Sequence, residues 1–170
     1  MSLAEYTKEF LQGALLDCPA AAAFTGAPSG AERAANALLT VTIPIAVGAA
    51  GTAGTPLAES EPTAIPFDGE VIDAYFTALT AVAQDPTNVA TFVLNKRDAA
   101  GANKTVVASK QTLTGGGGST VALAGYQLTL AAGAQNVVRG GCFTVEVTKQ
   151  GAGVATPAGN ITVVLRQRSV

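Results

Sequence analysis

Few residues in this chain are of types that carry out chemistry, and they are scattered. The 170 residues include no histidine, no tryptophan and only two cysteines, Cys18 and Cys142. A hydrolase triad needs a base beside its nucleophile, and no such arrangement is recognisable. The two cysteines are too few and too far apart for a zinc site or a disulfide framework. We therefore expect a protein that is not an enzyme, without catalytic residues, metal or cofactor, in which Cys142 is a small buried residue.

Three acidic residues close together, Asp68, Glu70 and Asp73, are the best candidates for a catalytic carboxylate pair. Glycosidases use two carboxylates that flank the same sugar bond. Because side chains alternate along a strand, Glu70 and Asp73 are expected on opposite faces, which argues against such a pair. A calcium site at the Asp68 turn and sugar binding through Tyr75 and Tyr126 are alternatives that the residues leave open.

A glycine run at 115–118, followed by Ser119 and Thr120, is similar in composition to a phosphate-binding loop. Such a loop needs a lysine before its hydroxyl residue and lies between a strand and a helix. Neither condition is met by this sequence. A flexible loop is therefore expected at the glycine run.

Charge is sparse and unevenly distributed along the chain. Charged residues make up 13% of the sequence, about half the usual fraction of roughly 25%. Residues 1–85 contain two basic and ten acidic residues, whereas residues 86–170 contain eight basic and two acidic ones. Either the two halves neutralise each other within one fold, or an acidic N-terminal arm docks on another surface. The basic residues lack interleaved aromatics, so no nucleic-acid partner is expected.

No segment of the sequence has the pattern of a membrane or secretion signal. The N-terminus carries Glu5 and Glu9 and lacks a basic region before an apolar stretch. The longest apolar stretch, at 38–50, is too short and too rich in threonine to cross a bilayer. We expect a soluble protein that is made in the cytoplasm and has no membrane partner.

The first 37 residues are predicted to form a helix followed by an extended arm. Ser2 and Glu5 have the spacing of a capping box, and Pro19 ends the helical pattern. Residues 19–31 are rich in Ala, Gly and Pro, which favours an extended arm. A helix this short is marginal alone in water, so its apolar stripe needs a surface to lie on. The stripe that we expect to bind a partner consists of Leu3, Tyr6, Phe10 and Leu11.

The rest of the chain, residues 38–170, is predicted to be one all-β domain. Apolar residues alternate within short segments separated by turn residues, at 38–47, 70–81, 89–96, 104–113, 121–123, 126–130, 142–149 and 160–168. Pro44 restricts the first of these to an edge or a bulge. In the second, Ile72, Ala74, Phe76 and Ala78 are expected to lie on one face of the strand. This number of strands and turns indicates an antiparallel sandwich or barrel.

Four segments of the β-rich region carry a resemblance to a known family. They read I-P-F-D-G-E-V-I-D-A-Y-F-T-A, V-A-T-F-V-L-N-K, C-F-T-V-E-V-T-K and I-T-V-V-L-R. From Ile65 onward, about 100 residues in all, the chain resembles the capsid decoration (cement) proteins of tailed bacteriophages. The resemblance implies an antiparallel jelly-roll β-sandwich of about eight strands. It also implies a homotrimer that binds the major capsid protein on the outer surface of the phage head.

These observations lead to one expected function and one alternative. Low charge, a lack of catalytic groups and an apolar N-terminal stripe are typical of a protein that packs against partners. Together with the resemblance, these features lead us to expect a virion structural protein on the capsid exterior, which stabilises the head. The alternative is a carbohydrate-binding or host-surface-binding module of a head or tail fibre, built on the same fold.

Overall fold

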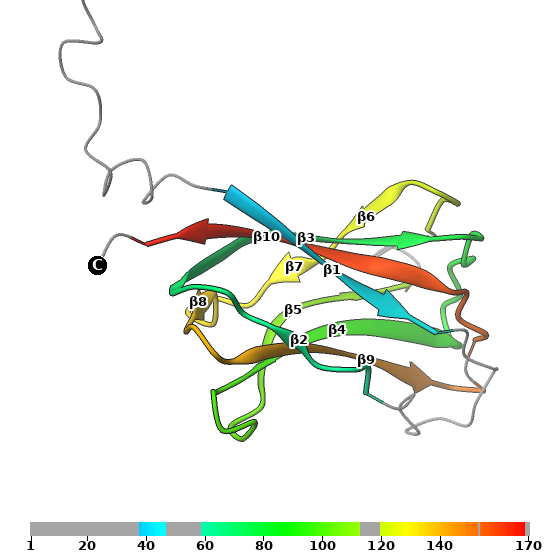
Figure 1. Cartoon of the computed structure of the whole chain (residues 1–170). Helices are drawn as coiled ribbons and strands as arrows, with labels where there is room; N and C mark the ends of the chain where they lie inside the picture. The colour runs from blue at the N-terminus through cyan, green and yellow to red at the C-terminus, as the bar shows by residue number, and fades with distance from the viewer. Residues whose placement is uncertain (1–37, 47–58, 113–119, 153, 169–170) are drawn as a thin grey trace, which may run out of the picture.

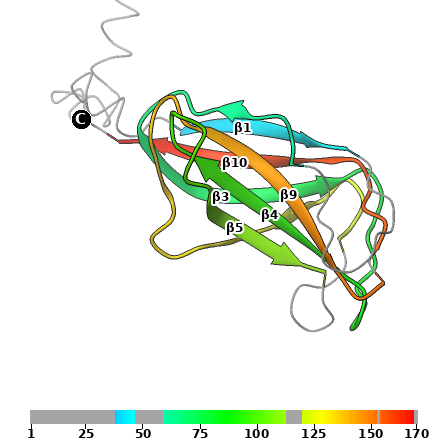
Figure 2. The same cartoon turned by 90° about the horizontal axis from the view of Figure 1, so that it is seen from below.

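Two antiparallel sheets pack face to face in the computed structural model (Figure 1; Figure 2), which describes residues 38–46, 59–112, 120–152 and 154–168. The first sheet has the order β1 (Leu38–Ile45), β10 (Gly159–Gln167), β3 (Gly69–Ala78) and β6 (Gly125–Gln127), with β8 (Asn136–Val137) also on β3. The second has the order β2 (Thr63–Ala64), β9 (Cys142–Gln150), β4 (Val89–Arg97), β5 (Thr105–Gln111) and β7 (Thr129–Leu130). The all-β, antiparallel prediction is confirmed for the described residues.

Strands from the first half of the domain pair with strands from the second half in reverse order. Thus β1 pairs with β10, β2 with β9, β3 with β6 and β8, and β4 with β5. The chain alternates between the two sheets through its first four strands and then returns beside them. Because β1 and β10 come from opposite ends of the domain, much of the pairing is between residues distant in sequence, which is the kind that forms slowly.

The core lies between the sheets and follows the alternation expected from the sequence. Ala90, Phe92 and Leu94 of β4 are all buried. The inward residues of β9 and β10 are also buried, as predicted: Phe143, Val145, Val147, Ile161, Val163 and Leu165. The rings of Phe76 from β3 and Phe92 from β4 stack with their centroids 4.0 Å apart. This aromatic contact joins the two sheets at the centre of the core.

A β-bulge in β3 changes which side chains face the core. In the pairing with β10, Asp73 lies opposite Val164 and Val71 lies opposite Leu165, so Ile72 has no partner residue. Val71 is buried and Ile72 is partly exposed. The prediction that Ile72 shares a face with Ala74, Phe76 and Ala78 is therefore wrong, because the bulge inserts one residue into the alternation. The bulge also places Glu70 and Asp73 on the same, outer face of the sheet, contrary to the expectation from simple alternation.

Other differences from the predicted elements are local. Residues 121–123 form a turn instead of a strand, and Leu123 adopts a φ of +59° there. The strands β2 and β8 have two residues each, too few to show a periodic pattern. Cys142 was expected to be buried but is partly exposed, because the next residue, Phe143, occupies the inward position of β9. Pro44 does lie in an edge strand, as predicted.

The central aromatic pair gives a test of the core. We expect Phe92→Ala to lower the free energy of unfolding by about 3–5 kcal/mol, because it removes a buried ring and leaves a cavity between the sheets. Urea denaturation followed by circular dichroism measures this change. The control is Val121→Ala, at a side chain that is 65% exposed, where a change within about 0.5 kcal/mol is expected. Equal effects of the two substitutions would contradict the observed packing.

Candidate functional site

The strand β1 forms a long, uncharged edge of the first sheet. It pairs with β10 along all eight of its residues, LLTVTIPI, and its other side meets no strand within the described residues. Leu38 and Leu39 are 62% and 40% exposed. The other outer strands, β2, β6, β7 and β8, are only two or three residues long. An exposed edge of this length presents backbone N–H and C=O groups on which another strand can pair.

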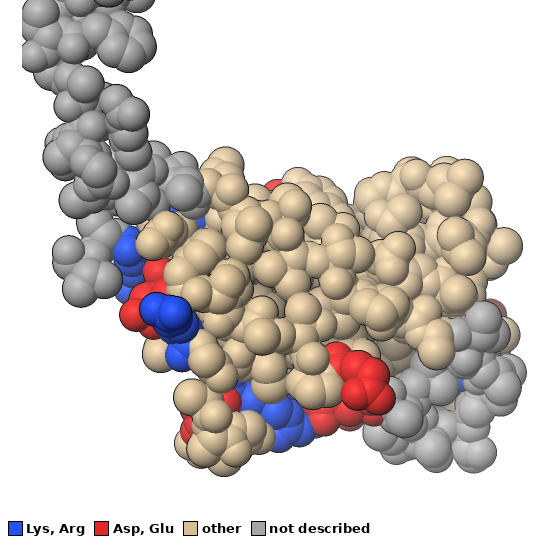
Figure 3. All heavy atoms as spheres, viewed as in Figure 1, with Lys and Arg blue, Asp and Glu red and all other residues tan. Residues whose placement is uncertain are grey.

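The outer face of the first sheet carries little charge next to this edge. Residues at alternate positions of β1, β10 and β3 form this face: Thr40, Thr42, Pro44, Asn160, Thr162, Val164, Tyr75 and Thr77. Asp73, Glu70 and Arg166 add charge to this face, and Arg166 lies opposite Leu38 at one end of β1. Figure 3, which looks at the side of the sandwich where β1 lies in front in Figure 1, shows a broad area without charged side chains, with the charged ones gathered at one end and along the lower side. Scarcity of charge is typical of the central part of protein–protein interfaces.

One end of the sandwich holds an ion-pair cluster around Glu70. The carboxylate of Glu70 accepts hydrogen bonds from the guanidinium groups of Arg166 and Arg168, the latter at 3.3 Å. Arg168 also donates to the side-chain oxygen of Asn136 at 2.6 Å. The hydrogen bonds from Arg166 and Arg168 hold the pKa of Glu70 below its ordinary value. Two guanidinium groups therefore share one carboxylate at this end, and their hydrogen bonds join β3, β8 and β10.

A second polar network ties residues 59–60 to the second sheet. Glu59 accepts a hydrogen bond from the hydroxyl of Thr144 in β9 and pairs with Arg97 of β4 at 2.7 Å. Ser60 exchanges hydrogen bonds with the backbone of Val145, each 2.9 Å long. The hydrogen bond from Thr144 lowers the pKa of Glu59; burial opposes this effect and Arg97 adds to it. The charged groups of Glu59 and Arg97 therefore pair with each other within the chain.

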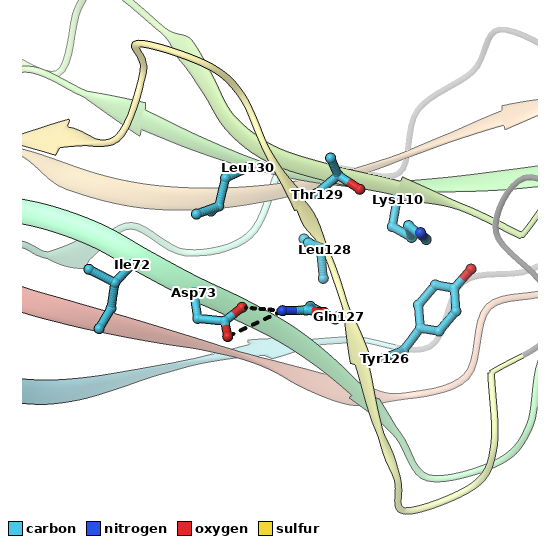
Figure 4. Close-up of a pocket in the computed structure, with 8 residues that line it drawn as sticks. All are labelled: Ile72, Asp73, Lys110, Tyr126, Gln127, Leu128, Thr129 and Leu130. Carbon is cyan, nitrogen blue, oxygen red and sulfur yellow. Dashed lines mark hydrogen bonds between the residues drawn. The ribbon is translucent and has the colours of Figure 1, made fainter.

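An open pocket of about 530 Å³ lies where the chain crosses from β6 in one sheet to β7 in the other (Figure 4). Its lining comes from β3, β5 and the crossing segment: Ile72, Asp73, Lys110, Tyr126, Gln127, Leu128, Thr129 and Leu130. The bulge in β3 contributes to this pocket, because both Ile72 and Asp73 line it. The residues that β3 presents to the pocket therefore depend on the register between β3 and β10.

The carboxylate of Asp73 is held by three neighbours. It accepts hydrogen bonds from the backbone N–H of Ala74 at 2.9 Å, from the Gln127 amide at 3.1 Å and from the Tyr75 hydroxyl. Burial alone raises the pKa of Asp73, but the hydrogen bonds from Tyr75 and Gln127 outweigh it, so the pKa lies below its ordinary value. The same contact with Asp73 raises the pKa of Tyr75. Asp73 is therefore a fixed, ionised group at the pocket.

The sequence indicated four residues for sugar binding or hydrolysis, and the structure brings only some of them together: Tyr75, Tyr126, Glu70 and Asp73. Tyr126 lines the pocket and donates a hydrogen bond from its hydroxyl to the backbone oxygen of Gln111 at 2.7 Å, whereas Tyr75 contacts Asp73. Glu70 and Asp73 share a face, yet the pKa of each is lowered. A glycosidase needs one carboxylic acid with a raised pKa. This pair does not provide one.

Two other sites were predicted from the sequence: a calcium site at the Asp68 turn and a partner-binding stripe near the N-terminus. At the Asp68 turn, the carboxylate accepts a hydrogen bond from the backbone N–H of Arg139 at 2.7 Å. No group of three or more His, Cys, Asp or Glu side chains suited to a metal ion occurs in the part of the chain that the structure describes. The expected partner-binding residues lie outside the described residues and stay a prediction: Leu3, Tyr6, Phe10 and Leu11.

The Glu59 network gives a pH-dependent test. Because the pKa of Glu59 is lower in the folded state, its contribution to stability is present above the ordinary carboxyl pKa and is lost as the pH falls through the folded value. We expect Glu59→Gln to cost about 1 kcal/mol of unfolding free energy near pH 7, and less below about pH 4. Urea titrations across this range measure the difference. Glu61→Gln, at an exposed position, is the control; a cost for Glu59→Gln that does not change with pH would contradict the role of the charge.

Neither a membrane-spanning helix nor a similar known protein gives a further indication of function. Among the residues that the structure describes, no helix is long and apolar enough to span a membrane. Comparison of the chain with models of protein families, with curated proteins and with solved structures found no match. The function is therefore inferred from the surfaces and contacts of the chain itself.

Proposed function

We propose that this chain is a structural protein of a virus particle: a jelly-roll capsid decoration (cement) protein that binds the outer surface of a phage head as a homotrimer. Its partners would be the major capsid protein and further copies of itself. The observation that carries the proposal is the long, uncharged edge of β1 beside a face with little charge. The role needs no catalytic group and no cofactor.

The order of the strands supports the jelly-roll assignment. With β7 and β8 set aside, and the equally short β2 kept as the partner of β9, eight strands remain in the described residues. They form the sheets β1–β10–β3–β6 and β2–β9–β4–β5. A jelly roll is a double sheet of eight strands that contains two Greek keys, and this architecture builds viral capsid domains and lectin domains. Both the proposed function and its carbohydrate-binding alternative are compatible with such a fold.

The edge of β1 supports an assembly role through the energetics of strand pairing. Natural edge strands are commonly blocked by lysine, by proline or by bulges. Here β1 has no charged residue, and Pro44 lies near its end. A strand from another molecule can therefore add to the sheet along most of its length, with main-chain hydrogen bonds supplying affinity. Leu38 and Leu39 would gain burial in such a contact.

A repeated lattice would strengthen contacts that are individually weak. When many copies bind one shell, each contact becomes effectively intramolecular once its neighbours are in place, and the overall avidity rises. The N-terminal stripe of Leu3, Tyr6, Phe10 and Leu11 supports a second attachment point, because an apolar stripe gains burial only on a surface. Segments that order on binding lose chain entropy, and multivalency offsets that cost.

Removal of residues 1–37 tests the attachment part of the proposal. We expect the truncated chain to lose binding to capsids, because the apolar stripe is gone, while its β-sandwich remains folded. Co-sedimentation with capsids stripped of the protein measures binding, and circular dichroism with thermal melting measures folding. A full-length variant with Leu3→Ala and Phe10→Ala separates loss of the stripe from loss of the whole segment. Undiminished binding of the truncated chain would refute the role of the arm.

A charge placed on the β1 edge tests the assembly surface. We expect Thr42→Lys to weaken assembly about tenfold or more, because burying an unpaired ammonium costs more than the roughly 1.4 kcal/mol that a tenfold change requires. Analytical ultracentrifugation of the free protein and capsid binding measure the effect. Thr105→Lys adds the same charge at an exposed position of β5 and should change neither. Equal behaviour of the two variants would rule out β1 as an assembly edge.

A further inference from the structure

We propose that the pocket between β6 and β7 is a binding site for a neutral saccharide. This inference is independent of the assembly role, since the pocket is built by β3, β5 and the crossing segment and does not include β1. Its volume of about 530 Å³ falls within the range of roughly 300–1,000 Å³ that is usual for small-ligand sites. The pocket is open to solvent, which suits a sugar unit presented on a larger glycan.

The polar groups of the pocket include both donors and acceptors that have no partner among the described residues. The ammonium of Lys110 makes no ion pair or hydrogen bond there, and neither the Thr129 hydroxyl nor the Gln127 side-chain oxygen has one. Asp73 is an ionised carboxylate with two oxygens, and its present hydrogen bonds leave room for a further donor. A ligand with several hydroxyl groups can satisfy this mixed set, because each hydroxyl donates and accepts.

The charges on the lining select against other small ligands. Lys110 contributes one positive charge and Asp73 one negative charge, and these are the ionised groups of the lining. A phosphate or sulfate would meet the carboxylate of Asp73, and a metal cation or an amine would meet Lys110. A neutral polyol has no such conflict and can bridge the two groups. The balanced charge therefore favours a neutral sugar over an anion or a cation.

The apolar part of the lining is suited to the C–H face of a sugar ring. Figure 4 shows the ring of Tyr126 beside Lys110 and Gln127, with Ile72 on the other side of Asp73 and Leu130 above Asp73. The hydroxyl of Tyr126 is held by the backbone oxygen of Gln111. Asp73 and Gln127 are joined by hydrogen bonds of 3.1 and 3.3 Å. These groups are ordered before any ligand arrives, so little side-chain entropy is lost on binding.

Direct binding of sugars to the full chain tests this proposal. Glucose, galactose, mannose, N-acetylglucosamine and their disaccharides are titrated, with saturation-transfer NMR and calorimetry as readouts. We expect at least one of these neutral sugars to bind with a dissociation constant on the order of millimolar, since a monosaccharide has few heavy atoms. Sialic acid and inorganic phosphate are included as anionic competitors, and neither should bind comparably.

Matched variants locate the binding site. We expect Lys110→Met to weaken sugar binding about tenfold, because it removes a charged hydrogen-bond donor, and Gln127→Ala to weaken it as well. Lys104→Met removes a lysine that pairs with Glu146 outside the pocket and should leave sugar affinity unchanged. Thermal melting of each variant checks the fold; Lys110→Met should melt like the parent. Absence of binding by every neutral sugar, preference for the anions, or affinity unaltered in both pocket variants would each overturn the proposal.

Discussion

The contact between Phe76 and Phe92 connects the two sheets, and the rest of the molecule depends on that packing. Each ring belongs to a central strand of its own sheet, and both are fully buried. Because strands of the two sheets alternate along the chain, neither sheet can be completed without the other. All the fully buried large side chains in the described part of the domain are apolar and belong to this one shared layer or its margins, whereas a few large apolar residues, among them Leu38 and Leu123, stay exposed. What remains for the outer surfaces is mostly threonine, alanine, glycine and a few charged residues.

Charged residues are distributed unevenly over the outer surfaces of the two sheets. The charged residues near Glu59 and Glu70 form ion pairs within the chain. These contacts hold residues 59–60 against β9 and join β3 to β10. The strand β1 has no charged residue, and on the face beside it charge is carried by Glu70, Asp73 and Arg166. A surface of this kind is poorly protected against association. An unblocked edge is expected in a protein that pairs with other molecules, as the proposed assembly role requires. In a protein that stays monomeric, such an edge would only favour aggregation.

The inward-facing residues could be predicted from the sequence for those strands in which apolar and polar residues alternate without interruption. The inward positions of β4, β9 and β10 follow from period two alone, and the edge position of β1 follows from Pro44. The bulge at Ile72 could not be foreseen, because it depends on the register with β10, almost a hundred residues away. The pocket was missed for the same reason: Lys110 and Gln127 become neighbours only when β5 and the β6–β7 crossing lie together. The N-terminal stripe stays a prediction from spacing.

Hydrogen exchange at the β1 amides tests the central claim most directly. In the free protein, the amides that point away from β10 lack a strand partner within the described residues and should exchange rapidly. In assembled particles the same amides should become protected, while those of the core strand β4 stay protected in both states. Rapid exchange along the outer side of β1 in the assembled particle, as fast as in the free chain, would contradict the account.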